Sequence, residues 1–155
     1  MNKSIAFTIP GKPGAKGRPR FQKIGGFVKP YTPEETYNFE NLVKLYYRDA
    51  AIEAGIDMDI IPKGMFRIDI VAYFEITASK PKAWKELAAE GAIRPTSRPD
   101  WDNIGKIVSD ALNDIAWIDD SYIVDARVQK VFSKLPRVFV TITDITDTRD
   151  HWTTK

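Results

Sequence analysis

Alternating apolar and polar residues predict several β-strands along the chain. The clearest lies at residues 65–76, where every second position is apolar, so these side chains share one face. They are Phe66, Ile68, Ile70, Ala72, Phe74 and Ile76. Weaker signals predict strands at 4–9, 122–132 and 136–144, and a β-hairpin at 20–31 that turns at Gly25 and Gly26.

A long helix is expected from Thr32-Pro33 to about residue 53. Thr32 is a suitable N-cap, Pro33 suits the first helical position, and Glu35 would complete a capping box. Gly55 is placed to end the helix. One stripe of this helix is apolar and is therefore expected to be buried: Phe39, Leu42, Val43, Tyr46 and Ala50.

Two further helices are expected in the second half of the chain. A short one at about 80–90 would be capped by Ser79 and closed by Gly91. Another, at about 102–114, has Asp102 as its expected N-cap. Its apolar positions follow the spacing of a core stripe: Ile104, Ile107, Val108, Ala111 and Leu112.

This order of elements predicts a single compact α/β (α+β) domain over residues 1–144, with a mixed β-sheet flanked by helices. A chain of 155 residues with 43% hydrophobic residues is large enough to bury one core. Residues 145–155 are expected to form a polar C-terminal tail. The chain lacks an apolar run long enough to cross a membrane, so no membrane partner is expected.

The composition excludes several kinds of chemistry. Because the chain contains no Cys, it has no thiolate nucleophile and no Cys-ligated metal. Its one His is His151, which argues against a Ser-His-Asp triad and His-rich zinc sites. Catalysis must then use carboxylates, Lys, Arg, hydroxyls or a bound ion. The absence of Cys suits the cytoplasm.

Basic residues are concentrated near the N-terminus. Residues 1–33 contain seven of them and no acidic residue, although the net charge of the whole chain is only +2. This asymmetry predicts a segment that binds a polyanion such as DNA. Exposed aromatic residues in the same segment would stack on unpaired bases. The candidate DNA contacts are Lys12, Lys16, Arg18, Arg20, Lys23, Lys29 and, further along, Arg98. The alternative is a solvated surface hairpin whose aromatic residues pack inward.

Acidic residues gather in a different segment, residues 98–120. Asp100 and Asp102 precede and begin the expected helix, and the pair Asp119-Asp120 follows it. Carboxylates held together repel one another unless a cation lies between them. Oxygen ligands favour Mg²⁺ or Mn²⁺, which activate water at phosphodiesters. Lys106 is placed to neutralise charge on phosphoryl oxygens.

Each of these acidic signals also has a structural explanation. Asp102 alone is most often a helix cap, and an Asp-Asp pair at a turn most often serves the turn. Lys106 and Asp110, four residues apart, are commonly a surface ion pair. Trp101, between two acids, is expected to pack against the core rather than contact DNA.

The whole pattern resembles the RusA family of Holliday junction resolvases. The resemblance rests on Asp100-x-Asp102-Asn103, then Lys106, Asp110-Ala-Leu and Asp119-Asp120, together with the N-terminal run GKPGAKGRPRF. It implies a homodimeric, Mg²⁺-dependent endodeoxyribonuclease that cuts four-way junction DNA with paired symmetric nicks, in recombination and repair. A bacterial protein of phage or prophage origin is expected.

The resemblance also implies roles for individual residues. Asp100 and Asp102 match the first two catalytic acids and Lys106 the catalytic lysine. Asp120, rather than Asp119, matches the third acid, and these three acids would hold the metal. Asp110 would orient Lys106. Asn103, Asp110 and Asp119 are expected to orient the metal ligands and Lys106 without binding the metal themselves. Rival functions are a Mg²⁺ nuclease on flaps or other branched DNA, a non-catalytic DNA-binding module, and a Mg²⁺ phosphohydrolase of nucleotides.

Overall fold

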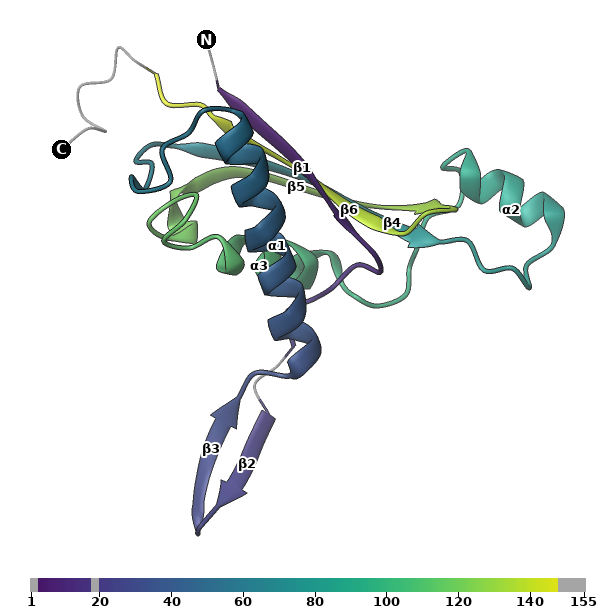
Figure 1. The fold of residues 1–155 in the computed structure, drawn as a ribbon. Helices are drawn as coiled ribbons and strands as arrows, with labels where there is room; N and C mark the ends of the chain where they lie inside the picture. Colours follow the sequence, from purple (N-terminus) through teal and green to yellow (C-terminus); the bar gives the residue numbers. More distant parts are fainter. Residues whose placement is uncertain (1–2, 18–19, 148–155) are drawn as a thin grey trace.

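The computed structural model describes residues 3–17 and 20–147. Its main sheet has four strands in the order β1-β6-β4-β5. The bounds of these strands are β1 Ser4–Pro10, β4 Phe66–Glu75, β5 Ile123–Ser133 and β6 Arg137–Asp144. β6 is antiparallel to both β1 and β4, whereas β4 and β5 are parallel. The predicted mixed sheet is thus confirmed, and Figure 1 shows it as the upper layer of the molecule.

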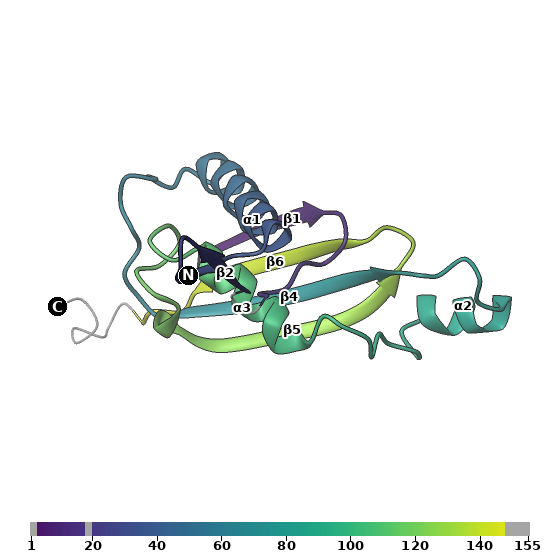
Figure 2. The same ribbon diagram turned by 90° about the horizontal axis from the view of Figure 1, so that it is seen from below.

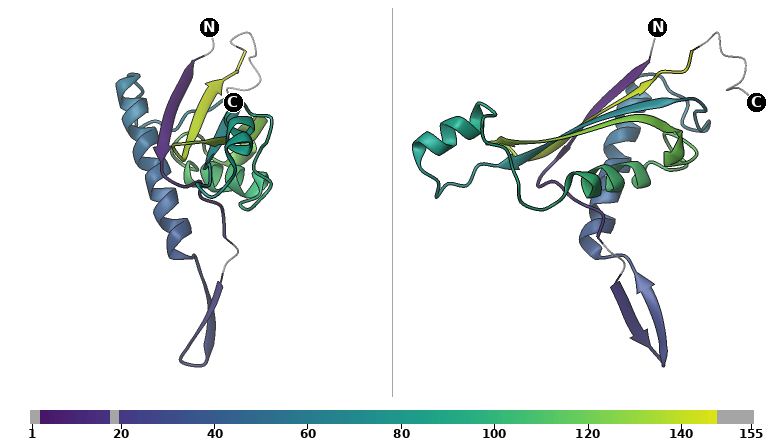
Figure 3. Two further views of the ribbon diagram at one scale, coloured as in Figure 1. Left: turned by 90° about the vertical axis from the view of Figure 1, so that its right-hand side faces the viewer. Right: turned by 180° about the vertical axis from the view of Figure 1, so that it is seen from behind.

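Two helices cover one face of this sheet. They are α1 (Glu34–Glu53) and α3 (Trp101–Ala111), which lie together beneath the strands in Figure 3. α3 belongs to the connection between the parallel strands β4 and β5, and parallel neighbours require such a crossover. At Gly105, a Cβ atom would lie 3.3 Å from the side chain of Val128 on β5. The glycine therefore allows α3 to approach the sheet closely.

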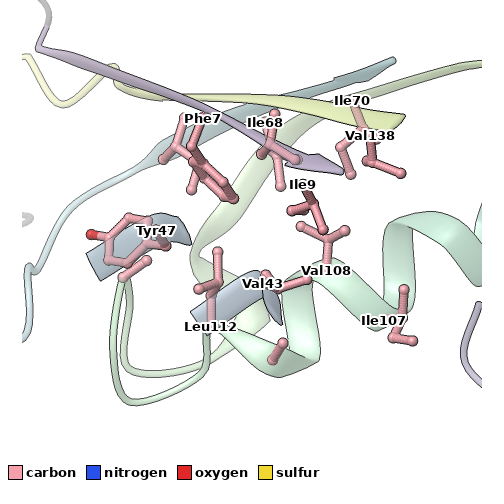
Figure 4. Packing of buried hydrophobic residues seen from close by; sticks show 14 of the residues in the cluster. Phe7, Ile9, Val43, Tyr47, Ile68, Ile70, Ile107, Val108, Leu112 and Val138 are labelled. Atoms are coloured by element: carbon pink, nitrogen blue, oxygen red, sulfur yellow. The ribbon is translucent and has the colours of Figure 1, made fainter. Parts of the chain in front are cut away.

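The core lies between the sheet and these two helices (Figure 4). Alternate residues of β4 are buried, from Phe66 to Phe74, as their spacing predicts. They meet Val43 and Tyr47 from α1 and Val108 from α3. Burial of this apolar surface provides the main stabilising contribution to the fold.

The buried face of α1 is shifted slightly from the expected stripe. Its buried residues are Thr36, Phe39, Val43, Tyr47 and Ala51. Of the expected stripe, Phe39 and Val43 are buried, and Tyr46 and Ala50 are partly buried against the core. Leu42 is exposed, so the expected stripe is wrong at that position. From Phe39 onward the buried residues repeat every four positions, which forms a narrow stripe against β1 and α3.

The expected helix caps are also corrected. Pro33 occupies the N-cap position of α1, and no side chain bonds the exposed amides there, so the predicted capping box does not form. The short helix α2 (Lys82–Ala89) begins after Pro81 instead of Ser79. Proline before a helix sets its own φ near the helical value, which starts the helix without a side-chain cap.

The predicted hairpin is confirmed as a separate two-stranded sheet. β2 (Arg20–Ile24) pairs with β3 (Phe27–Tyr31) around Gly25 and Gly26. Both glycines have positive φ, 56° and 85°, which a tight two-residue turn requires. Figures 1 and 3 show the hairpin projecting away from the body of the molecule, and Figure 2 views the molecule from that side.

Candidate functional site

α3 is the element that carries most of the candidate acids. Its buried side holds Ile104, Ile107 and Val108, so its polar residues face away from the core. The helix begins at Trp101, not at residue 102, and ends at Ala111. Asp100 therefore occupies the N-cap position, with extended backbone and no cap bond from its side chain. The expectation that Asp102 is the N-cap is wrong, because Asp102 lies within the first turn.

An ion-pair cluster occupies the polar side of α3. Oδ2 of Asp110 lies 3.5 Å from Nζ of Lys106 and 3.6 Å from Nζ of Lys16. Lys16 also donates a hydrogen bond of 2.5 Å to Oε1 of Glu40 on α1. Burial alone would lower the pKa of Lys16, but the hydrogen bond and charge of Glu40, with the charge of Asp110, raise it. The cluster therefore joins the basic loop, α1 and α3.

The two acids that follow α3 have different environments. Oδ1 of Asp119 accepts a hydrogen bond of 2.9 Å from the amide of Ser121, and that bond lowers the pKa of Asp119. Asp120 begins a short 3-10 helix, η1 (Asp120–Tyr122). Partial burial, followed by the charges of Asp110 and Asp119, raises the pKa of Asp120. Asp120 is thus the member of the pair that faces the cluster, while Asp119 serves the turn.

The structure does not gather the three expected metal ligands into one group. In the described part of the chain, no three acidic or His side chains lie close enough together to hold an ion. Asp102 and Asp110 are two helical turns apart, about 12 Å along the axis, and Asp120 interacts with Asp110. The donor chemistry nonetheless fits Mg²⁺, because all three groups are carboxylates. Asp120 also has the charges of Asp110 and Asp119 beside it, which together with its partial burial raise its pKa. A divalent cation would relieve the repulsion between these charges.

A groove of about 970 Å³ joins the basic loop to the start of α3. Arg98, Pro99, Asp100 and Asn103 form one wall. The loop and the start of α1 supply the rest: Lys12, Pro13, Gly14, Ala15, Lys16, Gly17, Arg20, Pro33, Glu35, Thr36 and Phe39. Four of the predicted DNA-binding cations therefore line the same groove as a predicted catalytic acid. Lys23 and Lys29 are exposed on the hairpin, and Arg18 lies outside the described residues.

The basic loop is fixed to the body of the protein along residues 11–17. The amide of Lys16 donates to the carbonyl of Asn103 on α3 (3.1 Å). The amide of Gly17 donates to Oγ1 of Thr36 on α1 (3.3 Å). A Cβ atom at Gly14 would overlap the ring of Phe39. These contacts hold the cations of the segment at set positions beside α3.

Two tryptophans differ from one another in burial. Trp101 is 65% exposed between Asp100 and Asp102, so the expectation that it packs in the core is wrong. Trp117, in contrast, is buried, and its indole N–H donates to Oδ1 of Asn113 (3.1 Å). At the first turn of α3 the core-facing position belongs to Ile104, and position 101 points to solvent.

The fold and groove define a class of protein. An α+β domain in which a cationic groove leads to exposed carboxylates is suited to a polyanionic substrate and to hydrolysis of its phosphodiester bonds. None of the helices within the described residues is both long and apolar enough to span a membrane.

Comparison with known proteins agrees with this class. The family described as Endodeoxyribonuclease RusA matches residues 10–143. The chain is also 37% identical over 143 residues to a Bacillus subtilis (strain 168) protein named "Uncharacterized protein YqaN", covering 91% of this chain and 96% of that protein. The chain belongs to the RusA family of Holliday junction resolvases, which confirms the resemblance inferred from its motifs. As a member of an endodeoxyribonuclease family, it is a nuclease.

Proposed function

We propose that this protein resolves Holliday junctions by hydrolysing one phosphodiester bond in each of two opposed strands. The observation that carries the proposal is the groove, in which Lys12, Lys16, Arg20 and Arg98 lead to Asp100. Cations of this kind bind phosphates in any sequence, so they position the DNA strand rather than select its bases.

Asp100, Asp102 and Asp120 are the proposed ligands of Mg²⁺, with Mn²⁺ as a substitute. When bound, the ion supplies the Lewis acidity that activates water and stabilises the leaving oxygen. Asp100 and Asp102 are exposed, so their side chains are free to turn toward an ion. Asp102 lies one turn before Lys106 on α3, and Asp110, the neighbour of Asp120, lies one turn after it. An ion bound near Lys106 is therefore within reach of Asp102 from one side and of Asp120 from the other.

The protein's own residues then perform three tasks. Groove cations hold the phosphates on either side of the bond that breaks. Lys106, 58% exposed on its side chain, neutralises charge that develops on the phosphoryl oxygens. Asp110 holds Lys106 at 3.5 Å and so fixes its direction. In the reaction, a water oxygen bonds to phosphorus and gives up a proton to the solvent, one P–O ester bond breaks, and the departing oxygen takes up a proton.

A homodimer supplies the second cut. Two strands of opposite polarity present two equivalent phosphates, and two copies related by a twofold axis would meet both. The oligomeric state in solution, measured by sedimentation with and without junction DNA, tests this part. A monomer on the junction would contradict it.

Cleavage assays test the central proposal. Synthetic four-way junctions, flaps, duplexes and single strands are incubated with the protein in Mg²⁺ and in EDTA, with each strand end-labelled in turn. We expect paired nicks at symmetric positions on junctions in Mg²⁺ alone. Equal cutting of flaps would favour the rival branched-DNA nuclease, and binding without cutting in either Mg²⁺ or Mn²⁺ would favour the DNA-binding module.

Asp100→Asn is the diagnostic variant. Loss of a metal ligand is expected to lower the cutting rate about a thousandfold or more, while junction binding persists. Asp114→Asn is a matched control, because Asp114 is exposed, lies outside the groove, and has φ of 61°, which Asn tolerates. Equal activity of the two variants would exclude Asp100 from the site.

A further inference from the structure

The hairpin formed by β2 and β3 exposes apolar side chains that folding leaves in water. Phe21 and Phe27 are 71% and 74% exposed, and Ile24 and Val28 are more than half exposed. Every residue of both strands is exposed to solvent. The strands thus form no part of the core, and their apolar residues are available to a partner.

The pairing of the strands sorts these side chains onto two faces. Directly opposed residues point to the same side, and the sides alternate along each strand. One face carries the pairs Arg20–Tyr31, Gln22–Lys29 and Ile24–Phe27. The other carries Phe21–Pro30 and Lys23–Val28. The first face therefore has a cationic and polar stem that ends in an apolar tip.

The apolar tip is the cross-strand pair Ile24–Phe27, which flanks the two-residue turn of the hairpin. Gly25 and Gly26 reverse the chain in two residues, so Ile24 and Phe27 lie side by side at the end of the projection. Figure 3 shows this end far from α1 and α3. The root of the hairpin is Arg20, which lines the groove that also contains Asp100. A substrate seated in the groove would thus extend along the stem to the tip.

Charge identifies the occupant of this surface. The hairpin carries Arg20, Lys23 and Lys29 and no acidic residue. Because all its charged residues are basic, the hairpin would repel a second copy of itself. The phosphates of nucleic acid would instead neutralise the charges of its stem. Apolar side chains next to such cations are inserted between base steps by several DNA-bending proteins. Insertion costs least where stacking is already interrupted, as it is at a branch point.

We infer that Ile24 and Phe27 form a wedge that enters the branch point of junction DNA and stacks on its exposed bases. This inference rests on the proposed function, since it assumes a branched substrate in the groove. The wedge gives selectivity for branched over continuous DNA, because entry into a fully stacked duplex has to break stacking that a junction lacks. The stem cations contribute affinity for both.

The experiment uses the full chain with Asp100→Asn, which keeps the junction intact. A four-way junction carries 2-aminopurine beside the branch point, and a second junction carries it in the middle of one arm. We expect binding to raise the fluorescence at the branch point alone. Ile24→Ser with Phe27→Ser should abolish that rise and weaken junction binding about tenfold or more, with duplex binding nearly unchanged.

Two control variants separate the wedge from its alternatives. Ile60→Ser with Leu135→Ser removes two separate apolar side chains outside the groove that are 64% and 66% exposed, and it should leave the signal unchanged. Lys29→Gln should weaken junction and duplex binding alike and lower the salt slope by about one. Circular dichroism confirms that each variant is folded, and the single variant Phe27→Ser replaces the double one if it is not.

Each contrary result has a distinct meaning. An unchanged fluorescence rise in the tip variant, with native-like selectivity, overturns the wedge while the proposed function stands. Loss of a dimer in sedimentation, with the fluorescence rise retained, shows that the tip contacts a second copy and also overturns it. Failure of the native chain to cut or bind junctions overturns the proposed function itself. The two results that concern the wedge are interpreted only after the native chain has been shown to cut junctions, so failure of the wedge and failure of the proposed function are distinguished.

Discussion

The ammonium of Lys16 lies 3.6 Å from Oδ2 of Asp110, so a residue of the basic loop contacts the helix that carries the candidate acids. The same oxygen lies 3.5 Å from Nζ of Lys106. Glu40 of α1 holds Lys16 from the other side. The loop that is proposed to position DNA and the lysine that is proposed to stabilise the transition state therefore share one carboxylate.

Removing the Lys16 ammonium should loosen the basic loop. Lys16→Met is expected to cost about 1 kcal/mol of unfolding free energy, since Glu40 and Asp110 lose a partly buried partner. Lys16→Arg should retain most of that stability. The comparison is made by urea unfolding at neutral pH. Equal stability of the Lys16→Met variant and the native protein would mean that these ion pairs contribute nothing to the free energy of unfolding.

The same pair predicts an alkaline effect. The folded pKa of Lys16 lies above its ordinary value of 10.5, so its contribution is fully present below pH 10.5 and is lost as pH rises through the folded pKa. The stability difference between native protein and Lys16→Met should shrink above pH 10.5. A difference that grows in this range would reverse the assigned direction.

Asp120 is expected to destabilise the metal-free protein. Its folded pKa is raised above 3.8 by burial and by its acidic neighbours, so the folded state binds the proton more tightly than the unfolded chain does. Stability contributed by this group therefore falls as pH rises from 3.8 through the folded pKa. Asp120→Asn should melt at a higher temperature than native protein at pH 7, but not below pH 3.8.

Metal addition supplies the converse test. Excess Mg²⁺ should raise the melting temperature of the native chain and raise that of Asp120→Asn much less, because a ligand that binds only the folded state stabilises it. Asp119→Asn should respond to Mg²⁺ almost as the native chain does, since Asp119 is committed to the Ser121 amide. If Asp119→Asn rather than Asp120→Asn loses the response, the assignment within the pair is reversed.

Gly14 should tolerate no side chain. A methyl group there would overlap the Phe39 ring, so Gly14→Ala is expected to cost about 1–3 kcal/mol or to displace the basic loop. Phe39→Leu should partly relieve the clash, and a double-mutant cycle measures the coupling between the two sites. Strict additivity would show that the loop and the ring do not contact one another.

The two tryptophans give a paired prediction on stability. Trp117→Ala is expected to cost about 3–5 kcal/mol, because this side chain is fully buried and bonded to Asn113. Trp101→Ala should change stability by less than about 0.5 kcal/mol, since surface substitutions rarely do more. Chemical denaturation of both variants checks the contrast, and a large loss in Trp101→Ala would place that ring against the core.

Substitutions of Lys106 and of its partner Asp110 should slow DNA cleavage to different extents. Lys106→Ala is expected to lower the cutting rate about a hundredfold with junction affinity little changed, because charge neutralisation matters in the transition state. Asp110→Asn, which acts through Lys106, should lower it about 10–100-fold. Single-turnover cleavage separates the rate from binding, and additive losses in the double variant would mean that the two residues act independently.

Local patterns were sufficient for much of the fold. Alternation placed β4 correctly, and two consecutive glycines placed the turn of the hairpin. The buried face of α1 was harder to predict, because Leu42 and Val43 are both apolar and only contacts with the rest of the fold decide which one is buried. Trp101 was misplaced for a similar reason, since its size predicts burial but its position on α3 points outward.

The candidate site was less accessible from the sequence. Spacing identified the acids around α3, and it could pair Lys106 with Asp110 because they are one turn apart on one helix. It could not pair Asp110 with Lys16 or Lys16 with Glu40, which come from different elements. The separation of Asp119 from Asp120 likewise depends on a turn geometry that the two identical residue types do not reveal.

The exposure of both hairpin strands separates the proposed recognition surface from the folded core of this protein. Because β2 and β3 contribute nothing to the core, substitutions along them alter contacts with a partner at little cost in unfolding free energy. Related chains can therefore diverge here in length and chemistry while retaining the same body. Exchange of this one segment between family members would be a direct way to transfer substrate preference.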